Sequence, residues 1–98
     1  MELLFVYGTL QEPDVQLRII GRRVVGQPDT LDGYYKSQIS INGNVYPFAV
    51  EAAGSAIAGQ VLEVTTEELA LMDAYEGKEY RRIRVQLRSG RSAWVYCE

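Results

Sequence analysis

One carboxylate in this sequence lies where an apolar side chain is expected. Residues 67–76 have helical spacing, and Glu76 follows Leu69 by seven residues and Met72 by four. All three side chains therefore fall on the helix face that is predicted to pack on the core. Partial burial, the negative end of the helix and the neighbouring Asp73 should each raise the pKa of Glu76. A carboxyl group with a raised pKa is suited to general acid–base catalysis near neutral pH.

An ordinary surface role for Glu76 is also compatible with this spacing. The residue stands at the end of the predicted helix, next to Gly77 and Lys78, and Arg81 follows shortly after. Its side chain could point outward and form an ion pair with either cation, an arrangement that contributes little to stability. The spacing alone leaves both interpretations of Glu76 open.

A second candidate is the glycine turn after the first apolar run. Residues 3–7 are all apolar or aromatic and predict a buried strand, which Gly8 ends. Because glycine has no Cβ, the backbone around it can approach a ligand closely and direct successive N–H groups toward an anion. A simple turn is the alternative, since neither glycine-rich phosphate motif, GxxxxGKS/T or GxGxxG, is present.

The composition limits which chemistry remains. The 98 residues include no histidine and a single cysteine, Cys97. This excludes Ser-His and Cys-His catalytic pairs, His-ligated zinc, an internal disulfide and a CxxC motif. Any acid–base step must then use a carboxylate, a tyrosine or a lysine.

Two helices and several short strands are predicted to position these residues. Helices are expected over 14–20, between Pro13 and Gly21, and over 67–76, after the capping-box spacing of Thr65 and Glu68. Asn42-Gly43 predicts a hairpin, because both residues tolerate positive φ. Strands, seven or so in total, are expected at 3–7, 23–25, 31–36, 39–41, 45–51, 56–64, 82–88 and 92–96, with a turn at 27–29.

These elements predict a mixed α+β fold in a single domain spanning residues 1–98. So many short strands in so short a chain should curl into a small closed or nearly closed β-barrel, since closure removes exposed edges. The two helices should flank this barrel, with the second packed at its side, and Trp94 is expected in the core. No repeat, low-complexity tract or linker divides the sequence.

Charge and hydropathy argue against nucleic-acid and membrane partners. The formal net charge is −3, although six of the ten basic residues lie between Lys78 and Arg91. We interpret that cluster as a solvated outer strand face, and a surface for single-stranded nucleic acid is the alternative. No apolar run approaches the roughly 18 residues of a membrane span, and the first residues do not resemble a signal peptide. A cytoplasmic protein is expected, and its oligomeric state is left open.

Taken together, the glycine turn and the helix end resemble the gamma-glutamylcyclotransferase-like (AIG2-like) family over most of the chain. Two elements carry this resemblance, Tyr7-Gly8-Thr9-Leu10 after the first strand and Glu76-Gly77-x-x-Tyr80-x-Arg82. Weaker similarities are found at Leu31-Asp32-Gly33-Tyr34, Tyr46-Pro47 and Gly59-Gln60-Val61-Leu62. Residues 11–13 depart from the family, in which a basic residue and a glycine are common, and the sequence ends soon after Tyr96.

The resemblance implies an enzyme on a small barrel that needs no cofactor and no metal. Members act on gamma-glutamyl amines or peptides: the α-amino group of the substrate attacks its γ-carbonyl, releasing 5-oxoproline and a free amine. Glu76 would be the general acid–base, and the substrate would be bound by Tyr7, Gly8, Thr9, Leu10 and Tyr80. Because the substrate supplies the nucleophile, the lack of histidine and of a reactive cysteine fits this chemistry.

Two alternatives to this activity use the same predicted site. The first is acyl transfer or deprotection of a larger gamma-glutamyl conjugate, with the same catalytic residue acting on a different leaving group. The second is a non-catalytic module that binds a small ligand on the same fold. The changed loop after Leu10 and the end of the chain after Tyr96 motivate this second alternative.

Overall fold

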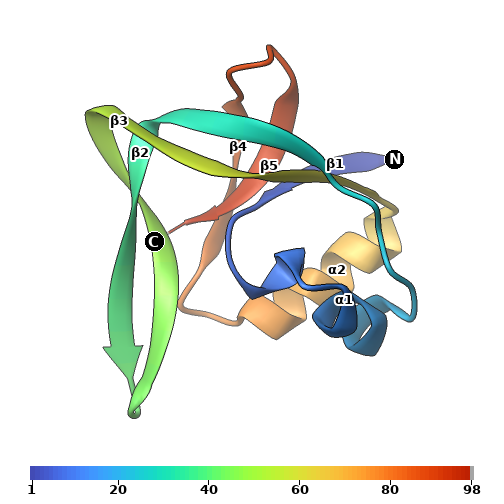
Figure 1. Cartoon of the computed structure of the whole chain (residues 1–98). Coiled ribbons are helices and arrows are strands. Elements are labelled where there is room, and N and C mark those ends of the chain that lie inside the picture. The colour runs from blue at the N-terminus through green and yellow to red at the C-terminus, as the bar shows by residue number, and fades with distance from the viewer. Residues whose placement is uncertain (98) are drawn as a thin grey trace.

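A curled five-stranded sheet with two helices beneath it forms this fold (Figure 1). The computed structural model describes residues 1–97, and within them every side chain except those of Ile39, Ile41 and Tyr46, so the last residue of the expected domain lies outside it. The elements in chain order are β1 (Glu2–Val6), the 3₁₀ helix η1 (Thr9–Gln11), α1 (Pro13–Ile20), β2 (Gln27–Ile41), β3 (Asn44–Val64), α2 (Thr66–Glu76), β4 (Arg81–Gln86) and β5 (Ser92–Cys97). The strand order is β2-β3-β1-β5-β4, in which only β1 and β5 run parallel.

Both helices end at the predicted residues and begin one residue before the predicted ranges. Pro13 occupies the first turn of α1, and Gly21 closes that helix in the left-handed conformation with φ 77°. In α2, the Glu68 N–H donates to Thr65 Oγ1 and the Thr65 N–H donates to Glu68 Oε1, which completes the capping box. Gly77, with φ 81°, ends α2. The mixed α+β fold with two flanking helices is therefore confirmed.

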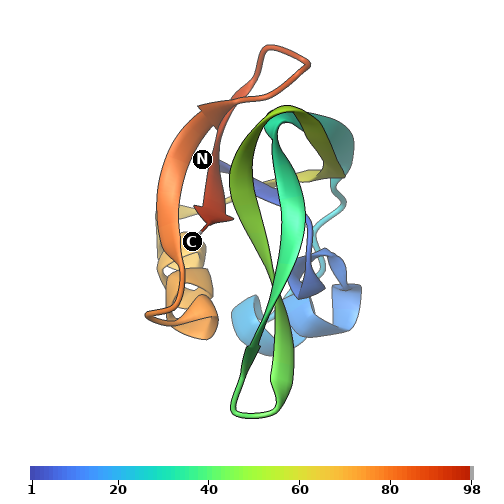
Figure 2. The same ribbon diagram turned by 90° about the vertical axis from the view of Figure 1, so that its left-hand side faces the viewer.

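Two long, bent strands replace most of the short strands that the sequence predicts. β2 and β3 pair from the hairpin turn at Asn42-Gly43 back to the barrel, and the register shifts between Asp32 and Tyr34. At this shift Gly33 and Gly54 have φ values of 83° and 85°. The glycines therefore bend a continuous pair of strands instead of ending it. Figure 2 shows the resulting arm of β2 and β3 twisting past the sheet.

The segment before this arm was predicted incorrectly. Residues 23–25 form a loop rather than a strand, and Val25 is 94% exposed. Residues 27–29 begin β2 instead of forming a turn. Pro28 is compatible with a strand here because β2 lies at the end of the sheet order, where a missing N–H donor breaks few ladder bonds.

The β4–β5 turn brings the two ends of the sheet together. Its Arg88 N–H donates to Thr30 O of β2 at 2.8 Å, and Arg88 also forms an ion pair with Asp32 at 2.6 Å. Beneath the turn, Asp29 accepts hydrogen bonds from Ser89 Oγ at 2.5 Å and Arg91 Nε at 3.1 Å. These contacts make the sheet a nearly closed barrel, as predicted.

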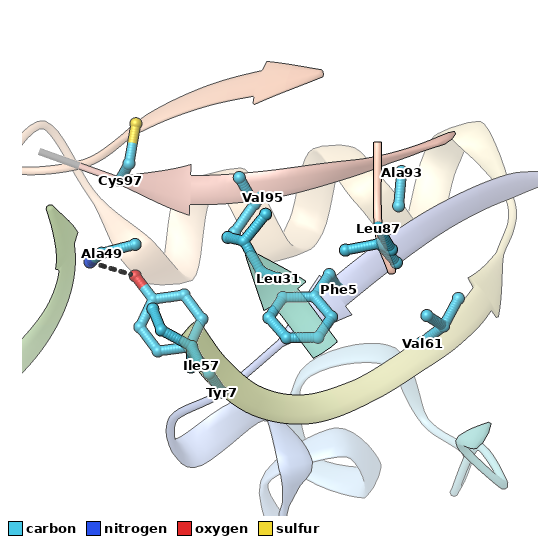
Figure 3. Close-up of a cluster of buried hydrophobic side chains, with 10 residues drawn as sticks. All are labelled: Phe5, Tyr7, Leu31, Ala49, Ile57, Val61, Leu87, Ala93, Val95 and Cys97. Carbon is cyan, nitrogen blue, oxygen red and sulfur yellow. Dashed lines mark hydrogen bonds between the residues drawn. The ribbon is translucent and has the colours of Figure 1, made fainter. Parts of the chain in front are cut away.

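After Glu2, strand β1 is apolar because its side chains enter two separate buried layers. Phe5 and Tyr7 face the barrel interior with Leu31 and Val95, which Figure 3 shows as one cluster. The alternate residues of β1 face the helices, in a second cluster that contains Leu4, Val6, Leu62, Val64, Leu69 and Met72. A strand buried on both faces has no polar positions.

A close approach of β1 and β3 depends on Gly59. A Cβ on this residue would lie 2.4 Å from Val6 O and 2.7 Å from Phe5 Cζ, closer than real Cβ contacts occur. Any larger residue would push the two strands apart. The glycine of the weaker family element at residues 59–62 therefore has a packing function.

The basic strand face is compensated by acidic side chains. Arg82 and Arg84 each lie over the ring of Trp94, 4.3 Å from its centroid, and pair with Asp73 and Glu2. Trp94 itself is half-buried and packs against the edge of the helix-side cluster, so its predicted place in the core is confirmed only in part. This surface is the solvated strand face that the sequence favours, and the absence of nucleic-acid binding stays a prediction.

Within residues 1–97 no helix is both long and apolar enough to cross a membrane.

Candidate active site

A cavity of about 480 Å³ opens between the end of β1 and the end of α2. It is lined by all six residues that the sequence predicts as a site, Tyr7, Gly8, Thr9, Leu10, Glu76 and Tyr80. The tip of the β2–β3 arm contributes Asn44 and Val45 to the same cavity, and β5 contributes Tyr96. The fold thus brings together two motifs that lie near opposite ends of the sequence.

Glu76 is half-buried in this cavity, in the last turn of α2. Burial raises its pKa to about 7, because the ionised form loses hydration that nothing replaces. Among residues 1–97 no lysine or arginine forms an ion pair with Glu76, so the alternative pairing with Lys78 or Arg81 does not occur there. A carboxyl group with this pKa can both accept and donate a proton near neutral pH.

Asp73 does not raise the pKa of Glu76, contrary to the expectation from the sequence. The charge of the Asp73 carboxylate is offset by its own partners. Its carboxylate accepts hydrogen bonds from Arg82 Nε at 2.9 Å and Arg82 Nη2 at 3.1 Å. The Tyr96 hydroxyl donates to the same carboxylate at 2.6 Å. Two neighbouring carboxylates on one helix therefore have different environments, one paired with an arginine and one facing the cavity.

The glycine turn lines the cavity and has backbone N–H groups that its own helix does not use. Its first backbone hydrogen bond runs from the Gln11 N–H to Gly8 O at 3.1 Å, so the N–H groups of Thr9 and Leu10 have no acceptor within η1. A Cβ on Gly8 would lie 3.0 Å from Pro47 Cγ, which leaves little space for a larger residue. This turn can bind a carboxylate or an oxyanion through its backbone.

A buried glutamine that the sequence analysis missed holds this turn in place. Gln16 is 1% exposed, its Nε2 donates to Leu10 O at 2.8 Å, and its Oε1 accepts from the Val24 N–H at 2.8 Å. Both ends of the amide are thus used, as a buried polar group requires. The only sequence signal was a polar side chain on the helix α1 next to the apolar Val15.

The tyrosines of the site donate their protons to fixed acceptors. The Tyr7 hydroxyl donates to Tyr96 O and accepts from the Ala49 N–H at 3.0 Å, the bond drawn in Figure 3. The Tyr80 hydroxyl donates to Pro47 O at 2.6 Å, and the Tyr96 hydroxyl donates to Asp73. Because Tyr7 is occupied in both directions, only its ring and backbone are available to a ligand. The Tyr96 oxygen, in contrast, keeps a lone pair for a donor.

Burial also keeps two of these phenols neutral. Desolvation raises the pKa of Tyr7 and of Tyr96, and for Tyr96 the hydrogen bond to Asp73 acts in the same direction. Both groups therefore remain protonated across the physiological pH range. Glu76 is the one lining group of residues 1–97 with a pKa that lies near neutrality.

Tyr75 completes the rim of the cavity and was missed by the sequence analysis. Its hydroxyl lies 2.8 Å from Thr9 Oγ1, which joins the glycine turn directly to the end of α2. Position 75 is adjacent to the predicted catalytic residue, and this was the only sequence signal available. Pro47, Tyr96 and the tip of the arm reach the cavity through tertiary contacts that the spacing did not predict.

Comparison with known proteins connects this chain to one family. Residues 4–98 match the family model described as "Gamma-glutamyl cyclotransferase, AIG2-like". The curated Arabidopsis thaliana AIG2-like protein D is 35% identical over 88 residues, which cover 89% of this chain and 57% of the relative. The chain spans about half the length of the curated relatives it matches.

Solved structures show the same fold. A solution structure of an Arabidopsis thaliana protein aligns with a TM-score of 0.81 and 28% identity, covering 98% of this chain and 61% of that one. A structure titled "Gamma-glutamyl cyclotransferase" aligns with a TM-score of 0.78 over 98% of this chain and 65% of its own. At 17% identity, this second likeness concerns the fold alone.

Proposed function

The chain belongs to the gamma-glutamyl cyclotransferase, AIG2-like family, and on this premise we propose that it is a cyclotransferase of gamma-glutamyl compounds. In the proposed reaction the α-nitrogen of the glutamyl group forms a bond with the γ-carbonyl carbon. The bond from that carbon to the leaving nitrogen breaks, and 5-oxoproline and a free amine are released. The substrate provides both the nucleophile and the electrophile, so the protein needs to supply only proton transfer and positioning.

Glu76 is the general acid–base of this proposal. As a carboxylate it takes a proton from the α-ammonium, which frees the nitrogen lone pair for attack. It then returns that proton to the leaving nitrogen as the tetrahedral intermediate collapses. The attacking nitrogen loses its second proton as the lactam forms, and the released amine or water accepts it. A pKa of about 7 allows one group to perform both steps near neutral pH, because neither protonation state is strongly disfavoured.

Neutral groups around Glu76 would bind the glutamyl part of the substrate. The N–H groups of Thr9 and Leu10 are suited to its α-carboxylate or to the oxyanion that forms at the γ-carbon. The Tyr96 oxygen, whose own proton is held by Asp73, is suited to accept from the α-ammonium. Tyr80 stacks on Phe48 with ring centroids 4.6 Å apart and forms a rigid wall of the same cavity.

The observation that carries this proposal is the unpaired, half-buried Glu76 in one cavity with the glycine turn. A carboxylate used only for stability would have a charged partner, as Asp73 does. The test is to incubate the protein with a panel of gamma-glutamyl amines and dipeptides and to measure 5-oxoproline. Release of 5-oxoproline from at least one compound is expected, and binding of the panel without any turnover would instead indicate a ligand-binding module.

A larger gamma-glutamyl conjugate is a second candidate substrate. The observation in its favour is the open rim, where Thr9, Val45 and Tyr75 are all exposed. A substrate attached to a bulky group can keep that group in solvent while its glutamyl end occupies the cavity. Release of 5-oxoproline from a gamma-glutamylated peptide or polymer, at a rate above that from a small amide, would select this candidate.

A further inference from the structure

We infer that Gln16, which does not itself line the cavity, is a positioning residue for the proposed reaction. Its side-chain amide fixes the backbone at Leu10, and with it the N–H groups of Thr9 and Leu10 that the proposal assigns to an anionic group of the substrate. This inference rests on the proposed function and adds one residue to it. It follows from the burial of Gln16, from the lack of a backbone donor for the Leu10 carbonyl, and from the way the amide is anchored.

Gln16 occupies a position where an apolar residue would ordinarily be found. Its side chain is 1% exposed and follows the buried Val15 on the short helix α1. Burial of a side-chain amide costs free energy that hydrogen bonds must offset. An apolar residue of the same size would avoid this cost, so the amide at position 16 indicates a polar task inside the core.

The carbonyl of Leu10 is the group that needs a donor. In a 3₁₀ helix, a carbonyl accepts from the N–H three residues later. For Leu10 that residue is Pro13, which has no N–H, and among residues 1–97 no backbone N–H donates to Leu10 O. Leu10 is 2% exposed, so little solvent reaches it. Gln16 Nε2 donates to this oxygen at 2.8 Å and takes the place of the absent backbone donor.

The other end of the amide is anchored to a separate segment. Gln16 Oε1 accepts from the Val24 N–H at 2.8 Å, in the loop between α1 and β2. Arg22 of the same loop donates to both carboxylate oxygens of Glu68, at 2.6 and 2.7 Å, in the capping box that begins α2. A rotated amide would place its NH₂ group against the Val24 N–H and its oxygen against Leu10 O. Both bonds therefore hold the amide in one orientation.

This constraint reaches the cavity through Leu10. The Gln16 bond fixes the plane of the peptide group that follows Leu10, and the preceding peptide group carries the Leu10 N–H. Thr9 and Leu10 line the cavity, and their N–H groups have no acceptor within η1. Loss of the amide would therefore let the turn change its orientation without removing any group from the cavity wall. The exposed contact of Thr9 with Tyr75 would remain as the second connection of the turn.

The first test replaces the amide with an apolar side chain of similar length. Gln16→Met neither donates nor accepts at these two positions, so we expect kcat/KM for a gamma-glutamyl amide to fall about tenfold. The Kd for 5-oxoproline, measured by calorimetry, should rise by a similar factor. The pH profile of kcat/KM should keep its inflection, because Glu76 is unchanged. Circular dichroism checks that the variant is folded at the assay temperature.

Two control variants separate positioning from a general loss of stability. Gln86→Met makes the same change at an exposed position of β4 that does not line the cavity, and it should leave both constants unchanged. Asp29→Ala removes the enclosed carboxylate under the β4–β5 turn, so it should lower the free energy of unfolding without changing the affinity for 5-oxoproline. An equal loss of affinity in Asp29→Ala and Gln16→Met would contradict a positioning role.

A measurement on the unaltered protein covers the case in which Gln16→Met does not fold. In NMR spectra of isotope-labelled protein, the side-chain amide resonances of Gln16 should shift when 5-oxoproline saturates the site, although Gln16 does not line the cavity. The side-chain amide resonances of Gln86 should stay in place. Gln16 resonances that do not move at saturation would overturn the inference.

The outcomes distinguish this inference from the proposed function. If kcat/KM and the affinity for 5-oxoproline are both unchanged in Gln16→Met, the inference is overturned while the cyclotransferase activity stands. If no gamma-glutamyl compound is turned over, the proposed function fails, and the affinity for 5-oxoproline alone decides the inference. A weaker affinity in Gln16→Met then supports it, and equal affinity, or no binding by the wild type, contradicts it.

Discussion

Two enclosed carboxylates lie beyond opposite ends of β4 and have opposite environments. Asp29, under the β4–β5 turn, has a side chain that is 3% exposed and is surrounded by Ser89, Thr30 and Arg91. Burial opposes its ionisation, but these hydrogen bonds and the arginine charge outweigh that effect and lower its pKa. Glu76, at the other end, has no such partners, and burial raises its pKa.

The contrast shows how one residue class serves two purposes in one small fold. A carboxylate supplied with donors and a cation joins distant parts of the chain, and its charge is fixed. A carboxylate enclosed without partners adds nothing to stability as an ion, but its proton can move near neutral pH. The predictions below test whether the two ends of β4 differ in this way, from the largest expected effect to the smallest.

Glu76→Gln should abolish most activity and leave binding intact. The amide has nearly the same shape but cannot exchange a proton, so turnover is expected to fall about 10²–10⁴-fold. The measurement is 5-oxoproline release, together with calorimetric binding of the same substrate. Glu67→Gln, at an exposed position in the first turn of α2, is the matched control and should keep its activity. Turnover of Glu76→Gln at the wild-type rate would remove Glu76 from the mechanism.

Asp29→Ala should destabilise the fold by about 3 kcal/mol. The change removes several hydrogen bonds and leaves the Arg91 guanidinium without its acidic partner. Urea unfolding of the variant and of the wild type measures this difference in the free energy of unfolding. Asp14→Ala is the matched control: its ion pair with Arg23 is solvent-exposed, so a loss below about 0.5 kcal/mol is expected. If the two losses were equal, the enclosed pair at the β4–β5 turn would have no special structural role.

The difference in stability between wild type and Glu76→Gln should depend on pH in a defined direction. The pKa of Glu76 rises from an ordinary 4.5 to about 7 on folding, so the folded protein binds more protons within this interval. Wild-type stability should therefore fall as the pH rises from about 4.5 to about 7, whereas the glutamine variant lacks this loss. The variant should gain about 3 kcal/mol relative to wild type across the interval, at about 1.4 kcal/mol per pKa unit.

Unfolding free energies measured at several pH values test this prediction. Asp29, with its lowered pKa, should act in the opposite sense, and its contribution should be lost as the pH falls below the ordinary range of a carboxyl group. A difference between wild type and Glu76→Gln that is constant with pH would show that Glu76 is not desolvated.

The smallest effect is expected at the rim. Tyr75→Phe keeps the ring and removes the hydrogen bond to Thr9, so the glycine turn loses one connection to α2. Because this bond is exposed, we expect KM to rise about threefold with little change in kcat. Steady-state kinetics separate the two constants. Tyr35→Phe, an exposed tyrosine that does not line the cavity, should leave both unchanged.

Local signals predicted the elements that carry the site. Pro13 and Gly21 bound α1, the Thr65–Glu68 capping box begins α2, and Asn42-Gly43 forms the hairpin, because each acts through its own backbone or that of a near neighbour. For Glu76, the spacing from Leu69 and Met72 indicated the core-facing side of the helix, but it left an outward, ion-paired side chain open as the alternative.

The errors came from features that depend on distant partners. Gly33 and Gly54 bend strands instead of ending them, because the opposite strand continues to pair past the bulge. Trp94 stays half-buried at the edge of the helix-side cluster, where Arg82 and Arg84 lie over its ring. Tyr75, Tyr96 and Gln16 gain their place at the site through tertiary contacts alone, which composition and periodicity do not record.

The parallel pairing of β1 with β5 has a consequence for how the chain folds. Leu4 pairs with Trp94 and Phe5 with Val95, so these contacts close a loop of nearly the whole sequence. Contacts of such long range slow folding, since their loop-closure entropy is lost before they stabilise anything. On a ribosome, β1 must wait for β5 to emerge before its second edge is covered. The cavity, which needs Tyr96 from β5, is therefore complete only after β5 has been synthesised.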